Sequence, residues 1–139
     1  MAIPEAEPGL VFRYDFIWDR EAKAGRTIGK ERPACLAVAT DEDVDPQVVV
    51  ILPITHSEPG VGAAGVEIPS RVRHALGLDD ERCWVIVSEF NIDEWPPAGM
   101  APIPGRRGVF AYGVLPTPLF EKIKAEFFKH FDAGRGVRR

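Results

Sequence analysis

The chain has 139 residues and a formal net charge of −4, and 45% of its residues are hydrophobic and 27% charged. A chain of this length is expected to form one domain with a sizeable core, and these fractions are typical of globular proteins. The acidic balance argues against a protein that coats duplex nucleic acid through bulk electrostatic attraction.

The two ends of the chain carry no targeting signal that we detect. We expect a single domain over residues 1–139, with a core over about residues 9–133 and a basic, frayed tail over residues 134–139. The opening MAIPEAEPGL lacks the basic start and apolar run of a signal peptide, and no later segment reaches a membrane-spanning length. We therefore expect a cytoplasmic location and no membrane contact.

The first half of the chain predicts three strands. Residues 9–17 (GLVFRYDFI) alternate and are rich in β-favouring side chains, and residues 33–40 form a second apolar run after the polar loop 18–31. A turn, DEDVDP, leads into residues 47–55 (QVVVILPIT), whose unbroken apolarity indicates burial on both faces.

The second half mixes strands with two helices. The predicted elements are a short strand at 66–69, a helix at 70–77 ended by Gly77, a strand at 83–92, an ordered proline-rich loop at 95–108, a strand at 109–115 and a helix from Thr117, its N-cap, to the terminator Gly134. On the last helix an apolar stripe recurs at three- and four-residue spacing, which is typical of packing against a sheet; it comprises Phe120, Ile123, Phe127 and Phe131.

These elements predict a mainly β (β-rich α+β) fold. We expect a strongly bent antiparallel sheet or small barrel, with one short internal helix and a C-terminal amphipathic helix. The strand–helix alternation of a doubly wound parallel sheet is missing.

Metal and cofactor sites are not predicted. Cys35 and Cys83 lie inside apolar runs and are expected to be two buried thiols. His56, His74 and His130 are far apart and show no ligand spacing. We therefore expect no metal and no cofactor.

One rim of the predicted sheet combines a fixed cation with a hydroxyl. Arg32 precedes Pro33 at the start of one strand, and Thr55 ends the next strand. Because antiparallel neighbours joined by a turn bring these positions to the same end, we expect both side chains to face one cleft.

The order of short motifs resembles the PemK/MazF family of bacterial toxins. The motifs are GLVFRYDF, then RPA at the head of an apolar strand, then PIT at the end of a β-branched strand, over about residues 9–91. The resemblance implies an SH3-like, CcdB-type barrel that forms a homodimer, cleaves single-stranded RNA without metal and is silenced by a cognate antitoxin.

The resemblance places two catalytic residues of the family on Arg32 and Thr55. If the ribose 2′-hydroxyl attacks the adjacent phosphate, negative charge develops on the phosphoryl oxygens. A guanidinium fork and a hydroxyl are suitable donors to that charge. Arginine remains protonated near neutral pH, so we assign Arg32 to charge stabilisation, with proton donation to the leaving oxygen as a further role.

His56 is a candidate general base or acid because an imidazole titrates near neutrality. Adjacent strand residues point to opposite faces, so His56 reaches the same phosphate as Thr55 only if the strand ends at Thr55. The alternative is a surface histidine without a catalytic role. Ser57 restores the two-residue spacing and is a candidate RNA contact.

Further RNA contacts are expected from a basic loop and a groove strand. Residues 20–32 hold five cations against two acids, and we expect Arg26 and Lys30 to contact phosphates, unless this loop is only a solvated connection. Glu89 and Asn91 fall where the family often has polar residues lining the RNA groove. The loop 95–108 has no counterpart in the family pattern, and it either covers part of the groove or binds a partner.

Two other functions remain open from the sequence. The first is a non-catalytic barrel that binds RNA or a protein segment. The second is a CcdB-like toxin that blocks a topoisomerase by protein contact, and it would not need Arg32 or Thr55.

Overall fold

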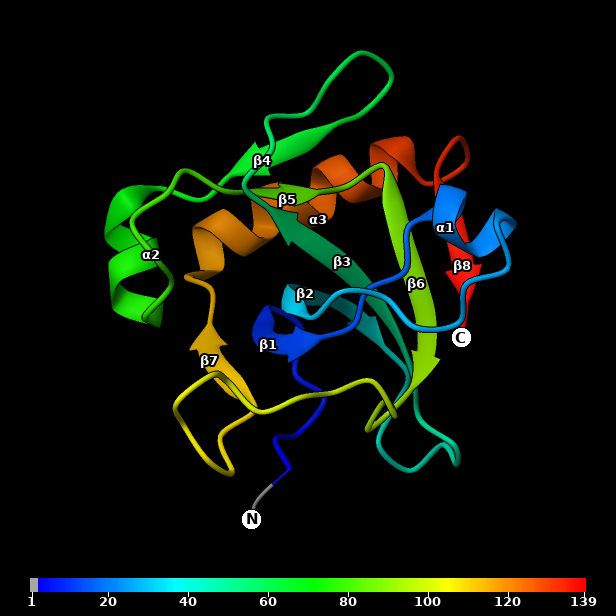
Figure 1. The fold of residues 1–139 in the computed structure, drawn as a ribbon, viewed down its shortest axis with the longest axis horizontal. Coiled ribbons are helices and arrows are strands. Elements are labelled where there is room, and N and C mark those ends of the chain that lie inside the picture. The colour runs from blue at the N-terminus through cyan, green and yellow to red at the C-terminus, as the bar shows by residue number, and fades with distance from the viewer. Residues whose placement is uncertain (1–2) are drawn as a thin grey trace.

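The computed structural model describes residues 3–139 as a mainly β fold in which eight strands form one sheet (Figure 1). The strands follow the order β4-β5-β3-β2-β1-β7, while β6 pairs with β3, and β8 pairs with β6. All these pairs are antiparallel except the parallel pair of β6 and β8. Within residues 3–139 the outer strands do not pair with one another, so the sheet is not closed.

The elements are short, as expected for a strongly bent sheet. Their bounds are β1 Leu10–Tyr14, α1 Asp19–Lys23, β2 Arg32–Ala39, β3 Val48–Thr55, β4 Gly65–Glu67, α2 Ser70–Leu76, β5 Trp84–Ile86, β6 Glu89–Glu94, β7 Ala111–Val114, α3 Thr117–His130 and β8 Arg135–Arg138. The mainly β prediction is confirmed, including a short internal helix and a helix near the C-terminal end.

Strand β3 organises the sheet because it pairs with three neighbours. Residues 49–53 of β3 pair with β2, its first half pairs with β6, and its end pairs with β5. Its side chains alternate between two apolar clusters: Val49 and Ile51 lie in one, and Leu52 and Ile54 in the other. The prediction that this strand is buried on both faces is therefore confirmed.

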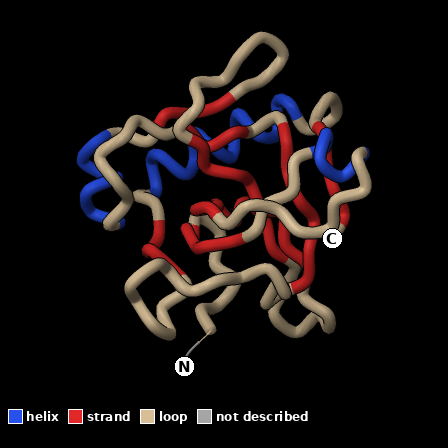
Figure 2. Tube along the Cα trace, in the orientation of Figure 1, coloured by secondary structure: helices blue, strands red, loops and turns tan. Residues whose placement is uncertain are grey.

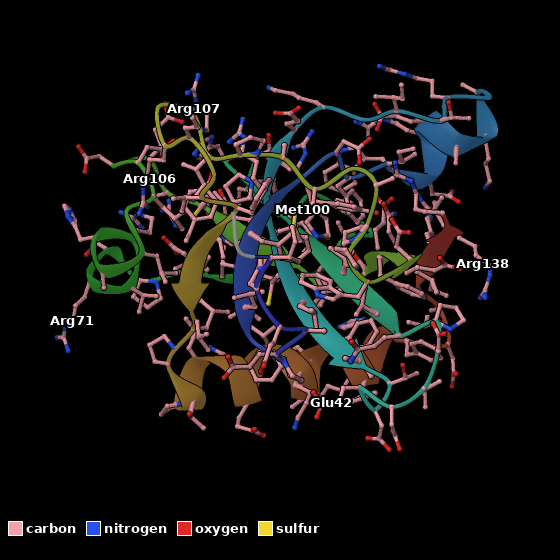
Figure 3. All side chains as sticks on the ribbon, turned by 90° about the horizontal axis from the view of Figure 1, so that it is seen from below. Glu42, Arg71, Met100, Arg106, Arg107 and Arg138 are labelled. Carbon is pink, nitrogen blue, oxygen red and sulfur yellow. The ribbon has the colours of Figure 1, made fainter. Side chains whose placement is uncertain are left out.

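The three helices lie around the strands, with α1 and α2 on opposite sides of the molecule (Figure 2). Helix α3 covers one face of the sheet, and the loop 95–108 lies on the other side (Figures 1 and 3). Phe120, Ile123 and Phe127 of α3 are buried, whereas Phe131 is 45% exposed because the helix ends at His130, before the predicted terminator. Helix α2 ends at Gly77, which adopts a left-handed conformation (φ 71°) as predicted.

Three local predictions need correction. The loop 18–31 contains α1, whose start is stabilised by the Glu21 carboxylate accepting the Trp18 N–H at 3.1 Å. The predicted strand 83–92 is divided into β5 and β6, which pair with different parts of the sheet. Most of the supposed frayed tail is strand β8, whose backbone pairs with β6.

Cys35 and Cys83 are buried free thiols, as predicted. In the part of the chain that the structure describes, every helix is too short or too polar to cross a membrane.

Candidate functional site

A pocket of about 500 Å³ opens at the end of the sheet where β2 begins and β3 finishes. This volume is in the usual range for ligand pockets. Its wall combines strand ends with three loops, and the lining residues are Arg13, Lys30, Glu31, Arg32, Pro33, Ile54, Thr55, His56, Ser57, Gly77, Leu78, Asp79, Cys83, Ile103, Pro104 and Tyr112. Five of the eight residues proposed from the sequence therefore lie here: Lys30, Arg32, Thr55, His56 and Ser57.

Arg32 and Thr55 lie on neighbouring strands at the same level. The β2–β3 register pairs Ala34 with Pro53, and extending it by two residues places Arg32 opposite Thr55. Strand alternation also puts both side chains on the face of Ala34 and Ile51. The register extended in this way makes Arg32 and Thr55 cross-strand neighbours, with Cβ atoms expected about 5 Å apart.

Arg32 is part of the pocket lining, and its guanidinium lies over an aromatic ring outside that lining. Its Cζ is 5.4 Å from the centroid of the Trp18 indole, and Arg20 contacts the same ring at 5.5 Å. The Nε of Arg32 is buried and makes no hydrogen bond to any described residue. Burial lowers the pKa of Arg32, and the nearby Arg20 and Arg13 act in the same direction against the opposing effect of Glu21. An anion at the rim would therefore supply a missing partner and compensating charge.

Thr55 is oriented by the chain that follows it. Its Oγ1 accepts the backbone N–H of Ser57 at 3.2 Å. Because a hydroxyl has one proton to donate as well as two lone pairs, this bond leaves the Thr55 O–H free for a ligand. Ser57 itself is exposed beside it.

His56 meets the geometric condition for sharing the pocket with Thr55, because β3 ends at Thr55 and the chain bends there. Its ring, however, is engaged by two carboxylates: Nε2 lies 3.0 Å from Asp79 Oδ1 and Nδ1 lies 3.3 Å from Glu81 Oε2. A neutral imidazole can donate only one of these bonds. Proton transfer by His56 therefore requires that at least one carboxylate move aside.

His56, Asp79 and Glu81 form a group that could hold a metal ion, found among residues 3–139. One ligand atom from each of the three lies within 4.8 Å of the other two. The expectation of no metal site was based on the spacing of the cysteines and histidines. It missed this group because Asp79 and Glu81 come from the loop between α2 and β5.

Arg13 is a pocket cation that the sequence analysis did not select. Its Nη1 donates to the Tyr112 hydroxyl at 3.2 Å and its Nη2 to the Glu31 carbonyl oxygen at 3.4 Å, while its Nε is buried without a hydrogen bond. Arg13 pairs with Pro33 across β1 and β2, next to the Tyr14–Arg32 pair. The available signal was a cation inside the largely apolar run GLVFRYDFI, whose other charged residue is Asp15.

The proline-rich loop contributes one wall of the pocket. Ile103 and Pro104 line it, and Ile103 is only 8% exposed. The loop is anchored beside Arg13, whose carbonyl oxygen accepts the Ala101 N–H at 3.0 Å. Of the two roles considered from the sequence, this geometry favours covering part of the groove.

Of the two cations proposed as phosphate contacts, only Lys30 lines the pocket. It is exposed, and none of the ion pairs found among residues 3–139 uses it. Arg26 lies outside the pocket and pairs with Glu21 at 3.2 Å. The basic loop is therefore divided between a pocket cation and a cation that stabilises α1.

Glu89 and Asn91 do not line the pocket. A carboxylate oxygen of Glu89 accepts the Asp19 N–H at 2.9 Å, at the start of α1. Asn91 is fully buried; its amide accepts from the N–H of Ile17 at 3.0 Å and donates to the Ile17 carbonyl at 2.8 Å. Because no surface of Asn91 is exposed, we withdraw it as an RNA contact, and both residues serve to hold the segment 17–19 against β6.

The arrangement combines fixed cations, a free hydroxyl donor and a partly apolar wall. Such a site suits a ligand with a negatively charged phosphate and an adjoining ring or chain. Comparisons of the chain with protein-family models, with curated proteins and with solved structures found no match.

Proposed function

We propose that this protein is an endoribonuclease that cleaves single-stranded RNA and acts as the toxin of a toxin–antitoxin pair. The observation that carries the proposal is that Arg32, at the start of β2, and Thr55, at the end of β3, both line one pocket. The motifs RPA and PIT support it, because their order resembles that of the PemK/MazF toxins.

In the proposed reaction the ribose 2′-hydroxyl attacks the adjacent phosphorus and the 5′-oxygen of the next nucleotide leaves. Arg32 and Thr55 donate hydrogen bonds to the phosphoryl oxygens on which charge develops. Arg13 and Lys30 hold neighbouring phosphates, and the ring of Trp18 beside Arg32 offers a stacking surface for a base. His56 takes the 2′-hydroxyl proton once its ring is released from Asp79 or Glu81.

The proposal extends to the rest of the family pattern. The strongly bent sheet around β3 supports an SH3-like, CcdB-type relationship in which the barrel is left open. A homodimer, a cytoplasmic location and a cognate antitoxin with a disordered segment complete it. No cofactor is needed for the chemistry as written.

A direct experiment is incubation of the purified protein with single-stranded RNA in excess EDTA. We expect endonucleolytic products that end in 2′,3′-cyclic phosphate, because the attacking oxygen belongs to the RNA itself. Intact RNA under these conditions would contradict the proposal, as would products ending in a 3′-hydroxyl.

One observation favours a second function, RNA binding without cleavage. Both ring nitrogens of His56 face carboxylate oxygens, which leaves the pocket without a free base. Filter binding distinguishes the two functions: the second predicts saturable binding of an RNA that stays uncut.

A further inference from the structure

The group His56, Asp79 and Glu81 lies where two chain segments meet beside the pocket. His56 follows directly after β3, and both acids belong to the loop between α2 and β5. The Nε2 of His56 is 3.0 Å from Asp79 Oδ1, and its Nδ1 is 3.3 Å from Glu81 Oε2. All three side chains are exposed, so an ion can reach them without any opening of the fold.

The backbone fixes both segments. Thr55, the residue before His56, pairs with Trp84 at the start of β5. The loop leaves α2 through the left-handed Gly77, and the Asp79 carboxylate accepts the Glu81 N–H at 3.1 Å. The three side chains thus project from a sheet end and a constrained turn, so bringing them together costs side-chain entropy but little backbone entropy.

The charge around the group favours a cation. In the ion pairs found among residues 3–139, Asp79 and Glu81 have His56 as their partner and no lysine or arginine. The nearest arginine in sequence, Arg82, is taken by Glu67 through two bonds of 2.9 Å. Two carboxylates therefore face one imidazole without a permanent positive charge between them.

We propose that His56, Asp79 and Glu81 bind one Zn²⁺ ion per chain at the rim of the pocket. Zinc takes imidazole nitrogen and carboxylate oxygen together at about 2.0–2.2 Å, usually with four ligands, which puts neighbouring donor atoms about 3.3–3.5 Å apart. One ligand atom from each residue lies within 4.8 Å of the others. Because Asp79 faces Nε2 and Glu81 faces Nδ1, an ion bound by one ring nitrogen requires the ring or one carboxylate to turn, and all three side chains are exposed and can do so. Mg²⁺ and Ca²⁺ are disfavoured because they prefer all-oxygen sites.

His56 and Asp79 both line the pocket, so an ion held by the three side chains would lie at its rim with one of four coordination positions left open. A water molecule or an anion oxygen would occupy that position. The zinc site does not depend on the proposed RNA cleavage, because it rests on the three side chains alone. A bound ion would occupy the His56 ring that the proposed cleavage uses as a base, so that cleavage belongs to the metal-free protein. The buried thiols are poor competitors for the ion: burial raises the pKa of Cys83 to about 11 and that of Cys35 to about 12, which keeps both protonated at neutral pH.

The test is isothermal titration calorimetry of the full chain with ZnCl₂ after removal of metals by EDTA and dialysis. We expect one ion per chain, and we expect both His56→Ala and Glu81→Gln to weaken binding at least tenfold. His74→Ala is the matched control: His74 is an exposed histidine that faces a single carboxylate, Asp80, at 3.4 Å, and its loss should leave the affinity unchanged.

The alternative outcomes overturn the proposal. Absence of saturable binding, unchanged affinity in both His56→Ala and Glu81→Gln, or an equal loss in His74→Ala would each show that the ion does not occupy this group. Equal affinity for MgCl₂ would overturn the assignment to zinc. Because all the substituted side chains are exposed, far-ultraviolet circular dichroism is expected to show every variant folded.

Discussion

Arg32 and Arg139 are two of the arginines that lie against aromatic rings in this protein, and their surroundings differ. Arg139 lies over Tyr14 at 5.2 Å and makes six hydrogen bonds, including a two-pronged contact with the Asp15 carboxylate at 3.1 and 3.1 Å. Arg32 lies over Trp18 at a similar distance, but its Nε is buried and unpaired. The first guanidinium is satisfied by its own chain and is structural, whereas the second retains capacity for a ligand.

The same contrast extends to the neighbouring groups. Around Arg139, the Tyr14 hydroxyl donates to Asp93 at 2.7 Å and both ends of the Asn91 amide bind Ile17. At the pocket, the buried Nε of Arg13 makes no hydrogen bond, although the Glu31 carboxylate lies 3.8 Å away, and the Thr55 hydroxyl keeps a free proton. Unsatisfied buried donors are uncommon in folded proteins. Of the three found among residues 3–139, the Nε atoms of Arg13 and Arg32 belong to pocket residues, which supports a ligand site there, and the third is the Nε of Arg73, outside the pocket.

The largest expected effect is on RNA cleavage by Arg32→Ala. Loss of a donor to developing charge costs about 10²–10³ in rate.

Arg20→Ala is the matched control, because Arg20 contacts the same Trp18 ring but does not line the pocket. We expect Arg20→Ala to lower the cleavage rate less than about threefold, which corresponds to less than about one kcal/mol in activation free energy. Single-turnover cleavage of a fluorescent RNA measures both. Equal losses in the two variants would assign the effect to Trp18 packing and not to Arg32.

The structural arginine should instead determine stability. Arg139→Ala leaves the Asp15 carboxylate, which is 11% exposed, without its partner, and breaking a buried ion pair costs about 3–5 kcal/mol. We expect the lower end of that range in the free energy of unfolding measured with urea.

Arg138→Ala is the control, because this neighbouring side chain projects away from the fold (Figure 3). A change within about 0.5 kcal/mol is expected for it, as for other surface positions. If both variants lose the same stability, the contribution comes from strand β8 in general and not from the Arg139 network.

High pH should weaken the structural network. Burial, together with the hydrogen bond to Asp93, raises the pKa of Tyr14 above its ordinary value of 10. Above pH 10 the unfolded chain loses this proton while the folded chain keeps it, so stability falls as the pH rises, by at most about 1.4 kcal/mol per pH unit.

Urea unfolding of the wild type and Tyr14→Phe at pH 8 and pH 11 measures this effect. Cys35 and Cys83 shift in the same direction, so the informative quantity is the difference between the two proteins. Tyr14→Phe should lose less stability between these pH values than the wild type. Equal losses would show that Tyr14 is not responsible for the alkaline weakening.

Much of the fold followed from local patterns in the sequence. The β-branched run of β3, the helix ending at Gly77 and the apolar stripe of α3 each carry a local signal, and each lies close to its predicted position. Helix α1 was missed because it has only five residues and no apolar stripe. Strand β8 was missed because a basic tetrapeptide forms a strand only through its distant partner, β6.

The site was predictable where it depends on sequential strands. Antiparallel pairing of β2 with β3 was enough to bring Arg32 near Thr55. The pairing of β3 with β5 brings Asp79 and Glu81 to His56. It joins segments that are distant in sequence, so no local sequence pattern predicts it. The prediction that Asn91 contacts RNA was wrong. Strand alternation indicates which face of the sheet a side chain lies on, but it does not indicate whether another segment, here residue 17, covers that face.

The central claim is that Arg32 and Thr55 act on one phosphodiester, and a double-mutant cycle tests it most directly. Single-turnover cleavage rates of the wild type, Arg32→Ala, Thr55→Val and the double variant give the coupling energy of the two side chains. If both donate to the same phosphate, we expect a coupling of about 1 kcal/mol or more, with the double variant less impaired than the product of the single losses. A double variant whose rate loss equals the product of the two single losses would contradict the claim. It would show that Arg32 and Thr55 act independently.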